Sequence, residues 1–310
     1  MIWAYLIHLS YNMWADRDVP ERDKYHSAKP YLRFDTRLWN DLLKKMAEVG
    51  ITVVLIDLGD GVEYESHPEI AVRNAWTVNR LRGELEKIRE MGMEPIPKLN
   101  FSTTHDTWLG LYSRCVSTDT YYEVCRNLVA EVIEIFDKPR FFHLGMDEET
   151  ARHQGYYSYV VVRQHDLWWH DFNFLVGEVE KGGARPWIWS DYVWLHPETF
   201  FKRMPRSVLQ SNWYYGAEFD EKINSVKAYL DLEEHGYDQV PTGSNWRVPE
   251  NFQETVNYCT RHIARERLLG FLQTVWRPTL EACRQRHIQA VELAGQAIAK
   301  WEKSRKRAPR

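Results

Sequence analysis

Short apolar runs rich in β-branched residues alternate with longer amphipathic stretches along the whole chain, and no other feature constrains the fold as strongly. This alternation is typical of parallel strands joined by crossover helices. Eight such units, closed on themselves, make a (β/α)8 or TIM barrel. We therefore predict an α/β fold in which residues 1–310 form a single barrel domain. The predicted strands are Ile2–Ser10, Ile51–Asp60, Glu94–Phe101, Phe141–Glu148, Pro186–Trp194, Val208–Tyr215, Asp238–Asn245 and Leu268–Trp276.

Helix boundary signals fill the segments between the predicted strands. Asp35 or Thr36 can cap the first helix, which should end at Gly50. Residues 197–203 offer only a short helix, so that unit is expected to be irregular. The other predicted helices are 76–92, 118–136, 160–181, 219–235, 249–265 and 280–303.

Composition narrows the class of partner. The formal net charge of -4 argues against a nucleic-acid partner. Aromatic residues make up 14% of the chain, and many of the 14 tryptophans lie near predicted strand ends. Sugar-binding sites need such flat apolar faces, because one side of a pyranose ring packs well on an indole. A carbohydrate is therefore the expected substrate.

The sequence carries no sign of a membrane anchor, a signal peptide or a disulfide framework. No apolar run approaches the ~18 residues of a membrane span, and the first residues lack a basic region. We expect a soluble protein without a membrane partner, cytoplasmic unless a leader has been removed; the oligomeric state stays open. The cysteines form no C-x-x-C pair, so free thiols are expected. They are Cys115, Cys125, Cys259 and Cys283.

Polar and aromatic side chains at the carboxyl ends of the predicted strands are the first candidates for a site, because barrel enzymes bind substrate there. Similar residues on the helices are not candidates. Strand-end position nominates five substrate contacts. They are His8, Asn100, Asp191, Asn245 and Trp246.

The end of the fourth strand carries the strongest chemical signal. The two-residue period of a strand puts His143, Gly145 and Asp147 on one face, and Glu148 reaches the same pocket if the chain leaves the sheet there. Gly145 is expected to leave room for a ligand or a neighbouring ring. Two carboxylates in an aromatic pocket repel each other, so one can stay protonated as a general acid while the other stays charged. Glycoside cleavage needs this division of roles.

A metal site is the alternative use of these groups. Carboxylate and imidazole ligand atoms are available, but their spacings match no specific ligand motif. An acidic cluster at the carboxyl end of a barrel strand is typical of catalysis as well as of metal binding. We therefore expect catalysis and no metal. The residues of this alternative are Asp57, His143, Asp147, Glu148 and Glu149.

The segment from His143 to Glu148, His-Leu-Gly-Met-Asp-Glu, resembles the His-x-Gly-Gly-Asp-Glu signature of family 20 glycoside hydrolases, the β-N-acetylhexosaminidases. That signature also ends strand four of a (β/α)8 barrel. His105 looks like the active-site histidine that the family places after strand three. The remaining similarity lies in aromatic residues at strand ends five, six and eight, where the family walls in the 2-acetamido group. These residues are Trp187 or Trp189, Trp213 with Tyr214 or Tyr215, and Trp276.

The resemblance implies an exo-acting, retaining hydrolase that uses substrate-assisted catalysis, without a cofactor. Glu148 would protonate the leaving oxygen and later activate water. Asp147 would orient the acetamido group, whose carbonyl oxygen attacks the anomeric carbon. Tyr214 or Tyr215 would donate a hydrogen bond to that carbonyl.

The chain departs from the family pattern at three places. Met146 replaces the second glycine of the signature, and strand one lacks the arginine that grips sugar hydroxyls. Arg277 and Pro278 follow Trp276, where the family usually has an acidic residue two positions on. Arg277 therefore suggests that the sugar carries an anionic substituent.

Two rival interpretations stay open. A retaining hydrolase with an ordinary nucleophile, Asp57 or Asp191 paired with Glu148, would act on sugars without an acetamido group. A non-catalytic sugar-binding barrel would accommodate the altered sugar-gripping positions without any turnover.

Overall fold

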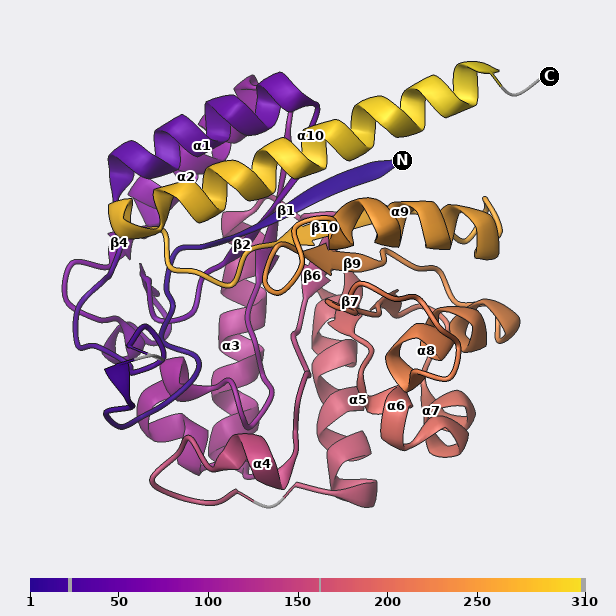
Figure 1. Ribbon diagram of the computed structural model, residues 1–310. Coiled ribbons are helices and arrows are strands. Elements are labelled where there is room, and N and C mark those ends of the chain that lie inside the picture. Colours follow the sequence, from indigo (N-terminus) through magenta and orange to yellow (C-terminus); the bar gives the residue numbers. More distant parts are fainter. Residues whose placement is uncertain (22–23, 162, 308–310) are drawn as a thin grey trace.

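The computed structural model describes residues 1–21, 24–161 and 163–307, and within these ranges eight parallel strands form one sheet (Figure 1). Backbone bridges from Gln210 to Gln239 and from Trp213 to Thr242 join its two outermost strands. The sheet is therefore a nearly closed barrel, and the predicted (β/α)8 fold is confirmed. The strands are β1 (Ile2–His8), β2 (Val53–Asp57), β5 (Glu94–Lys98), β6 (Phe141–His143), β7 (Arg185–Trp189), β8 (Leu209–Ser211), β9 (Thr242–Ser244) and β10 (Gly270–Thr274). Their order around the barrel is β8-β7-β6-β5-β2-β1-β10-β9.

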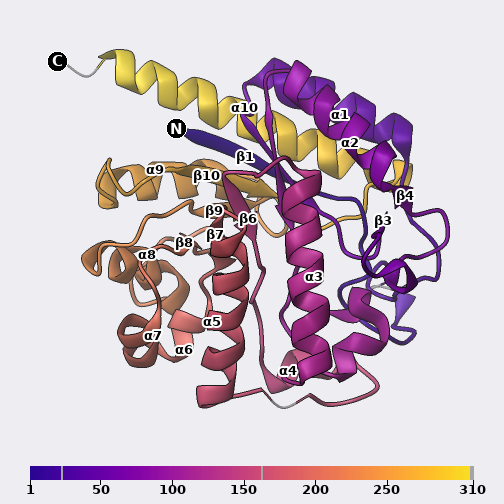
Figure 2. The same ribbon diagram turned by 180° about the vertical axis from the view of Figure 1, so that it is seen from behind.

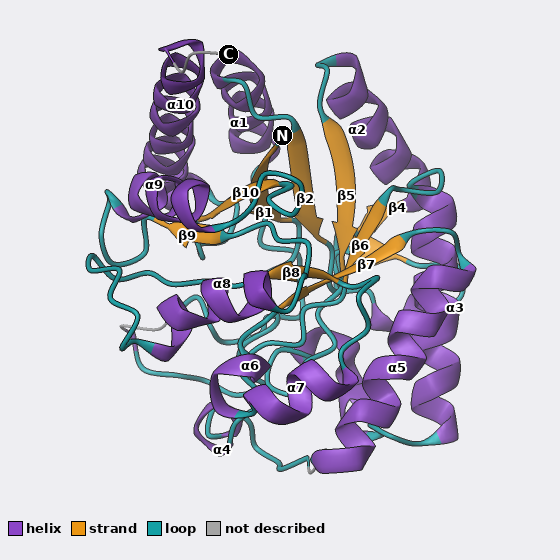
Figure 3. Cartoon of the chain, turned by 90° about the vertical axis from the view of Figure 1, so that its right-hand side faces the viewer, coloured by secondary structure: helices purple, strands orange, loops and turns teal. Residues whose placement is uncertain are grey.

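Helices lie outside the strands, which occupy the middle of the molecule in Figure 3. The Asp35 carboxylate caps the first helix by accepting the amides of Arg37 and Leu38, and Gly50 ends it with a φ of 89°. Figure 2 shows the third and fifth helices running side by side on the back of the barrel. The helices are α1 (Thr36–Val49), α2 (Val78–Glu90), α3 (Asp119–Ile135), α4 (Ala151–Gln154), α5 (His165–Lys181), α6 (Tyr192–Leu195), α7 (Pro197–Arg203), α8 (Asn224–Glu234), α9 (Asn251–His262) and α10 (Arg284–Arg307).

Two layers of apolar side chains make up the core. Along β1, Ala4 and Leu6 point into the barrel, whereas Tyr5 and Ile7 pack in the layer between strands and helices. This two-residue alternation follows from the pleat of a strand. It determines which strand-end side chains face the interior, and His8 continues the inward series.

The strands end earlier than predicted. β6 stops at His143 rather than at residue 148, and β8 and β9 have three residues each. Beyond the end of β6, the amide of Trp189 on β7 still donates a hydrogen bond of 3.0 Å to the carbonyl of Gly145. The acidic pair consequently lies on a loop, and this frees Glu148 to reach the pocket.

Several local features were not predicted. A short parallel pair, β3 (Val62–Glu63) and β4 (Trp76–Thr77), lies beside the barrel, and 3-10 turns cover Pro68–Ile70, Thr107–Arg114 and Glu281–Cys283. The short helices α4 and α6 were not predicted, and α6 covers the end of the fifth predicted strand. Helices α5 and α8 begin at His165 and Asn224 rather than at residues 160 and 219. The four cysteines are free thiols, as expected. Within the described ranges, no helix combines the length and the apolar character needed to cross a bilayer.

Candidate active site

A cavity of about 350 Å³ opens at the carboxyl ends of the strands, and both acidic residues of the predicted pair line it. Its walls are predominantly aromatic, which is the character expected for a site that binds a sugar ring. The end of β7 and the segments that follow β1, β6, β7, β8, β9 and β10 supply them. The lining residues are Trp14, His26, Asp147, Glu148, His153, Tyr156, Trp189, Trp194, Trp213, Tyr214, Tyr215, Gly216, Ser225, Trp246, Arg247 and Trp276.

The loop that carries the acidic pair has an unusual backbone. Gly145, Met146 and Glu148 have φ angles of 73°, 74° and 56°, a region that residues with side chains rarely adopt. The expectation that Gly145 leaves room for a ligand is wrong, because the Asn100 side chain fills that room. A Cβ on Gly145 would lie 1.9 Å from Asn100 Oδ1. That oxygen also accepts the amide of Met146 at 3.3 Å, so Asn100 holds the loop in shape.

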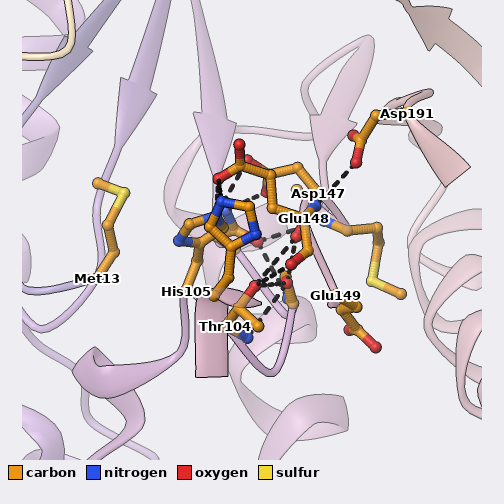
Figure 4. Close-up of polar contacts among 12 residues, drawn as sticks. Met13, Thr104, His105, Asp147, Glu148, Glu149 and Asp191 are labelled. Carbon is orange, nitrogen blue, oxygen red and sulfur yellow. Dashed lines mark hydrogen bonds and ion pairs between the residues drawn. The ribbon is translucent and has the colours of Figure 1, made fainter. Parts of the chain in front are cut away.

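Asp147 is buried and held by two neighbours. Asn100 Nδ2 donates to Asp147 Oδ1 at 2.8 Å, and His105 Nε2 lies 3.4 Å from Oδ2. Thr104 Oγ1 donates to the backbone carbonyls of Asp147 and Glu148 at 3.3 and 3.0 Å. Figure 4 shows His105 and Thr104 against the acidic pair. The carboxylate of Asp147 therefore has a fixed orientation.

Glu148 lies between two imidazoles. Its Oε2 is 3.2 Å from His105 Nε2 and 3.2 Å from His153 Nε2, and Thr150 Oγ1 lies 2.9 Å from His153 Nδ1. Burial by itself would raise the pKa of Glu148, but the hydrogen bonds and charges of the two histidines outweigh burial and lower it well below its usual range. Glu148 is therefore ionised near neutral pH.

The acid with a raised pKa is a different one. Burial, reinforced by the charge of Asp147, raises the pKa of Asp191 to about 8. Its Oδ2 accepts the backbone amide of Glu148 at 2.8 Å, drawn as a dashed line in Figure 4, and its Oδ1 accepts Trp213 Nε1 at 3.3 Å. We expected one member of the pair Asp147 and Glu148 to be neutral. The histidines instead stabilise the charge on Glu148, and Asp191, a third carboxyl group, is the one with the raised pKa.

His105 serves both members of the acidic pair. Burial lowers its pKa, but the charges of Asp147 and Glu148 outweigh that effect and raise the pKa above the ordinary value. The three side chains offer ligand atoms within 4.8 Å of one another, a spacing that a divalent cation could bridge. Because His105 Nε2 contacts both carboxylates, its proton occupies the same space, and the arrangement fits a shared proton at least as well as a metal.

The other residues of the metal alternative point elsewhere. Glu149 pairs with Arg163, and Arg163 lies 3.5 Å from Asp171 on α5. Asp57 lies 2.6 Å from Lys98 Nζ and 3.3 Å from His8 Nδ1 in the barrel interior. The five-residue cluster proposed as the metal alternative is therefore not brought together.

The structure decides between the two tryptophans predicted at the end of the fifth strand. Trp189, Trp213 and Trp276 line the cavity, whereas Trp187 donates Nε1 to Ser211 Oγ at 2.7 Å inside the barrel. Of the two tyrosines, Tyr215 is the better anchored, because its hydroxyl accepts Trp276 Nε1 at 2.9 Å. Burial raises the pKa of Tyr215, so the hydroxyl keeps its proton.

Several other candidates lie outside the residues that line the cavity. His143 is buried, with its ring 4.5 Å from that of Trp189, and burial lowers its pKa well below the ordinary value. Asn245 turns away and donates to the carbonyl of Arg286 at 3.0 Å. His8 and Asn100 bind other residues of the protein, as described above. Arg277 stacks behind Trp246, which does line the cavity.

Residues that were not among the predicted site residues complete the cavity. Trp14 and His26 come from the long segment after β1, and His153 and Tyr156 from the loop after β6. The useful signal was the length of these two connections, because long loops at this end of a barrel form the site. Trp194 and Arg247 also line the cavity.

Known structures share the fold of this chain, but sequence comparison finds no related protein. No protein-family profile matches the sequence, and no curated protein sequence matches it. Solved structures do. A β-N-acetylhexosaminidase from Bacteroides fragilis has a TM-score of 0.65 at 14% identity, over 95% of this chain and 65% of that chain.

Two further structures extend the comparison. An exo-β-N-acetylglucosaminidase from Vibrio harveyi, solved with N-acetylglucosamine, has a TM-score of 0.65 at 13% identity. The match covers 97% of this chain and 56% of the Vibrio chain. Dispersin B has a TM-score of 0.59 at 13% identity, and the match covers 95% of this chain and 98% of Dispersin B. The chain has the barrel fold of family 20 glycoside hydrolases. It spans less than two thirds of the Bacteroides and Vibrio enzymes, and identities this low establish the fold alone. The predicted resemblance is confirmed at that level.

Proposed function

We propose that the chain is a retaining β-N-acetylhexosaminidase-like glycosidase that uses the acetamido group of its own substrate as the nucleophile. One observation carries this proposal: Asp147 and Glu148 both line an aromatic cavity at the carboxyl ends of the barrel strands. The solved neighbours with the same barrel include proteins named β-N-acetylhexosaminidase and exo-β-N-acetylglucosaminidase.

The proton at the scissile bond passes through Glu148 in this mechanism. His105 holds a proton beside Glu148 Oε2, since its pKa is raised. A sugar that displaces water from the cavity favours the neutral pair over the charged pair, because a lower dielectric penalises separated charges. Glu148 then donates this proton to the leaving oxygen and takes one back from the attacking water.

The acetamido group is held from two sides. Asp147 is fixed by Asn100 and His105, so its carboxylate can accept the amide N–H of the substrate. Tyr215 already accepts Trp276 Nε1, which leaves its own O–H free to donate to the acetamido carbonyl. We therefore assign the carbonyl-binding role to Tyr215 rather than Tyr214.

The rival protein nucleophiles have less support. Asp57 is neutralised by Lys98 at 2.6 Å and lies outside the residues that line the cavity. Asp191 is occupied by the amide of Glu148 and the indole of Trp213, and its raised pKa makes it a poor nucleophile near neutrality.

Aryl β-glycosides of N-acetylglucosamine, N-acetylgalactosamine and glucose test the proposal. Wild type should cleave an acetamido sugar, and Glu148→Gln should lower kcat about 10²–10⁴-fold. Glu198→Gln, an exposed glutamate on α7, is the matched control and should retain activity. A thiazoline analogue of the cyclic intermediate should inhibit strongly. Cleavage of the glucoside alone, or trapping by a 2-fluoro glycoside, would instead establish a protein nucleophile. Sugar binding without turnover in every variant would establish a non-catalytic barrel.

A further inference from the structure

Three arginines surround one tryptophan of the cavity wall. Arg247 lines the cavity next to Trp246, and the guanidinium of Arg277 lies over the Trp246 ring, 4.5 Å from its centroid. Arg286 Nη2 donates to the carbonyl of Trp246 at 3.2 Å. These three residues form what we call the arginine wall.

Within the described part of the chain, none of the three arginines forms an ion pair with a carboxylate, and the side-chain donors of Arg277 and Arg286 bind carbonyl and amide oxygens. The guanidinium of Arg277 donates to the carbonyl of Trp276, and that of Arg286 to Gln289 Oε1 at 3.4 Å. Burial lowers the pKa of Arg286, and the neighbouring charge of Arg277 lowers it further, so two like charges face each other. By contrast, the buried Arg163 has both Glu149 and Asp171 as partners.

The position of the arginine wall separates it from the acidic pair. Trp246 and Arg277 follow β9 and β10, whereas Asp147 and Glu148 follow β6. In the nearly closed barrel β10 is four strands from β6 and β9 is three. Arg277 therefore lies across the barrel from the acidic pair, and Trp246 lies one strand nearer to it. A negative group bound at the arginine wall would be kept away from the carboxylates that would repel it.

We propose that the arginine wall is a subsite for an anionic substituent, a carboxylate or a sulfate ester, on the sugar that the cavity binds. This inference rests on the proposed function and names the class of its substrate. Guanidinium groups bind such anions through paired N–H donors, and a guanidinium stacked on an indole keeps the N–H edges free. Arg247 makes the direct contact, since it alone of the three lines the cavity. The charges of Arg277 and Arg286 act from behind Trp246.

Binding to the turnover-silenced Glu148→Gln protein tests the subsite. The probes are N-acetylglucosamine, its monosulfated forms and glucuronic acid, followed by tryptophan fluorescence or calorimetry. At low salt, at least one charged probe should bind about tenfold more tightly than the neutral sugar, and the advantage should shrink as salt rises. Comparing the sulfated sugars with the uronic acid distinguishes the two sources of charge.

Substitutions assign the effect to the arginine wall. Adding Arg247→Gln should remove most of the preference, and Arg277→Gln part of it, when the ratio of charged-sugar affinity to neutral-sugar affinity is measured within each variant. Arg247 is exposed, so its loss should not unfold the barrel. Arg82→Gln, on α2 and paired with Glu134, is the matched control and should keep the preference.

The outcomes separate the two proposals. Equal binding of neutral and charged sugars, or a preference that survives Arg247→Gln, would overturn the subsite and leave the proposed function standing. A charged preference in a wild-type protein that cleaves no glycoside would support the subsite and overturn the hydrolase. If no probe of either kind binds, both proposals fail.

Discussion

Asn100 and Gly145 fit together only because position 145 has no side chain: Asn100 Oδ1 occupies the place where a Cβ would stand. The same side chain donates to Asp147 and accepts the amide of Met146. Asn100, which follows β5, thus sets the shape of the loop that follows β6.

Gly145→Ala should therefore disturb the acidic pair. The methyl group must displace Asn100, and position 145 must also hold a φ of 73°, which favours glycine. We expect a loss of about 1–3 kcal/mol in the free energy of unfolding and a fall in kcat that exceeds this loss of stability. Urea unfolding and steady-state kinetics measure the two effects. Gly83→Ala is the control, because a Cβ there meets nothing within 4 Å and α2 should be slightly stabilised.

His153→Gln should move the pH profile of the enzyme. His153 and His105 both lower the pKa of Glu148, so removing one of them raises it. The proton that Glu148 shares with His105 is then held to higher pH, and the alkaline limb of kcat/KM should shift upward. His170→Gln, with a mostly exposed imidazole beside α3, should leave the profile unchanged. A profile that does not move, or moves to lower pH, would contradict the role given to His153.

Asp106→Asn should change how stability depends on pH. Asp106 is buried, both of its carboxylate oxygens lack a hydrogen-bond partner, and burial raises its pKa to about 8. The folded state thus binds this proton more tightly than the unfolded state. Its contribution to stability is fully present below about pH 4 and is lost as the pH rises towards 8.

The Asn variant cannot ionise, so its stability relative to wild type should improve steadily from pH 4 to 8, by on the order of a few kcal/mol. Urea unfolding at several pH values measures this slope. Asp18→Asn, at an exposed carboxylate, should run parallel to wild type. The prediction fails if the Asp106 variant also runs parallel.

Arg163→Leu should be among the most damaging single changes outside the cavity. It removes the counter-charge of two buried carboxylates, Glu149 and Asp171, and we expect a loss of about 3–5 kcal/mol in the free energy of unfolding. Arg203→Leu removes an ion pair to an exposed Asp166 and should cost about 1 kcal/mol or less. Similar losses in the two variants would mean that the Arg163 network is not structurally important.

The sequence predicted the eight barrel strands and the main helices well, because apolar runs and helix-capping residues are local signals. Asp35 and Gly50 bound α1 as expected, since capping depends only on nearby residues. Strand order also placed Glu148 at the carboxyl end of the fourth strand, but the predicted strand ran to Glu148, whereas β6 ends at His143. Side-chain partners were harder to predict, because they depend on contacts across the barrel.

Three such contacts changed the site. Asn100 fills the space expected for a ligand, and Asn245 turns towards α10 rather than the cavity. His153 contacts Glu148 from a loop whose path no local pattern specifies. The charge state of Glu148 could not be predicted without these histidines, because burial alone would have moved its pKa in the opposite direction.

The separation of β6 from β9 and β10, three and four strands away around the barrel, has a consequence for how such a protein can diversify. Groups proposed for bond cleavage cluster on the β6 side, whereas the proposed charge recognition belongs to the loops that follow β9 and β10. Replacing those loops could retune substrate choice while leaving the reaction chemistry untouched. The two properties are then free to evolve at different rates on one scaffold.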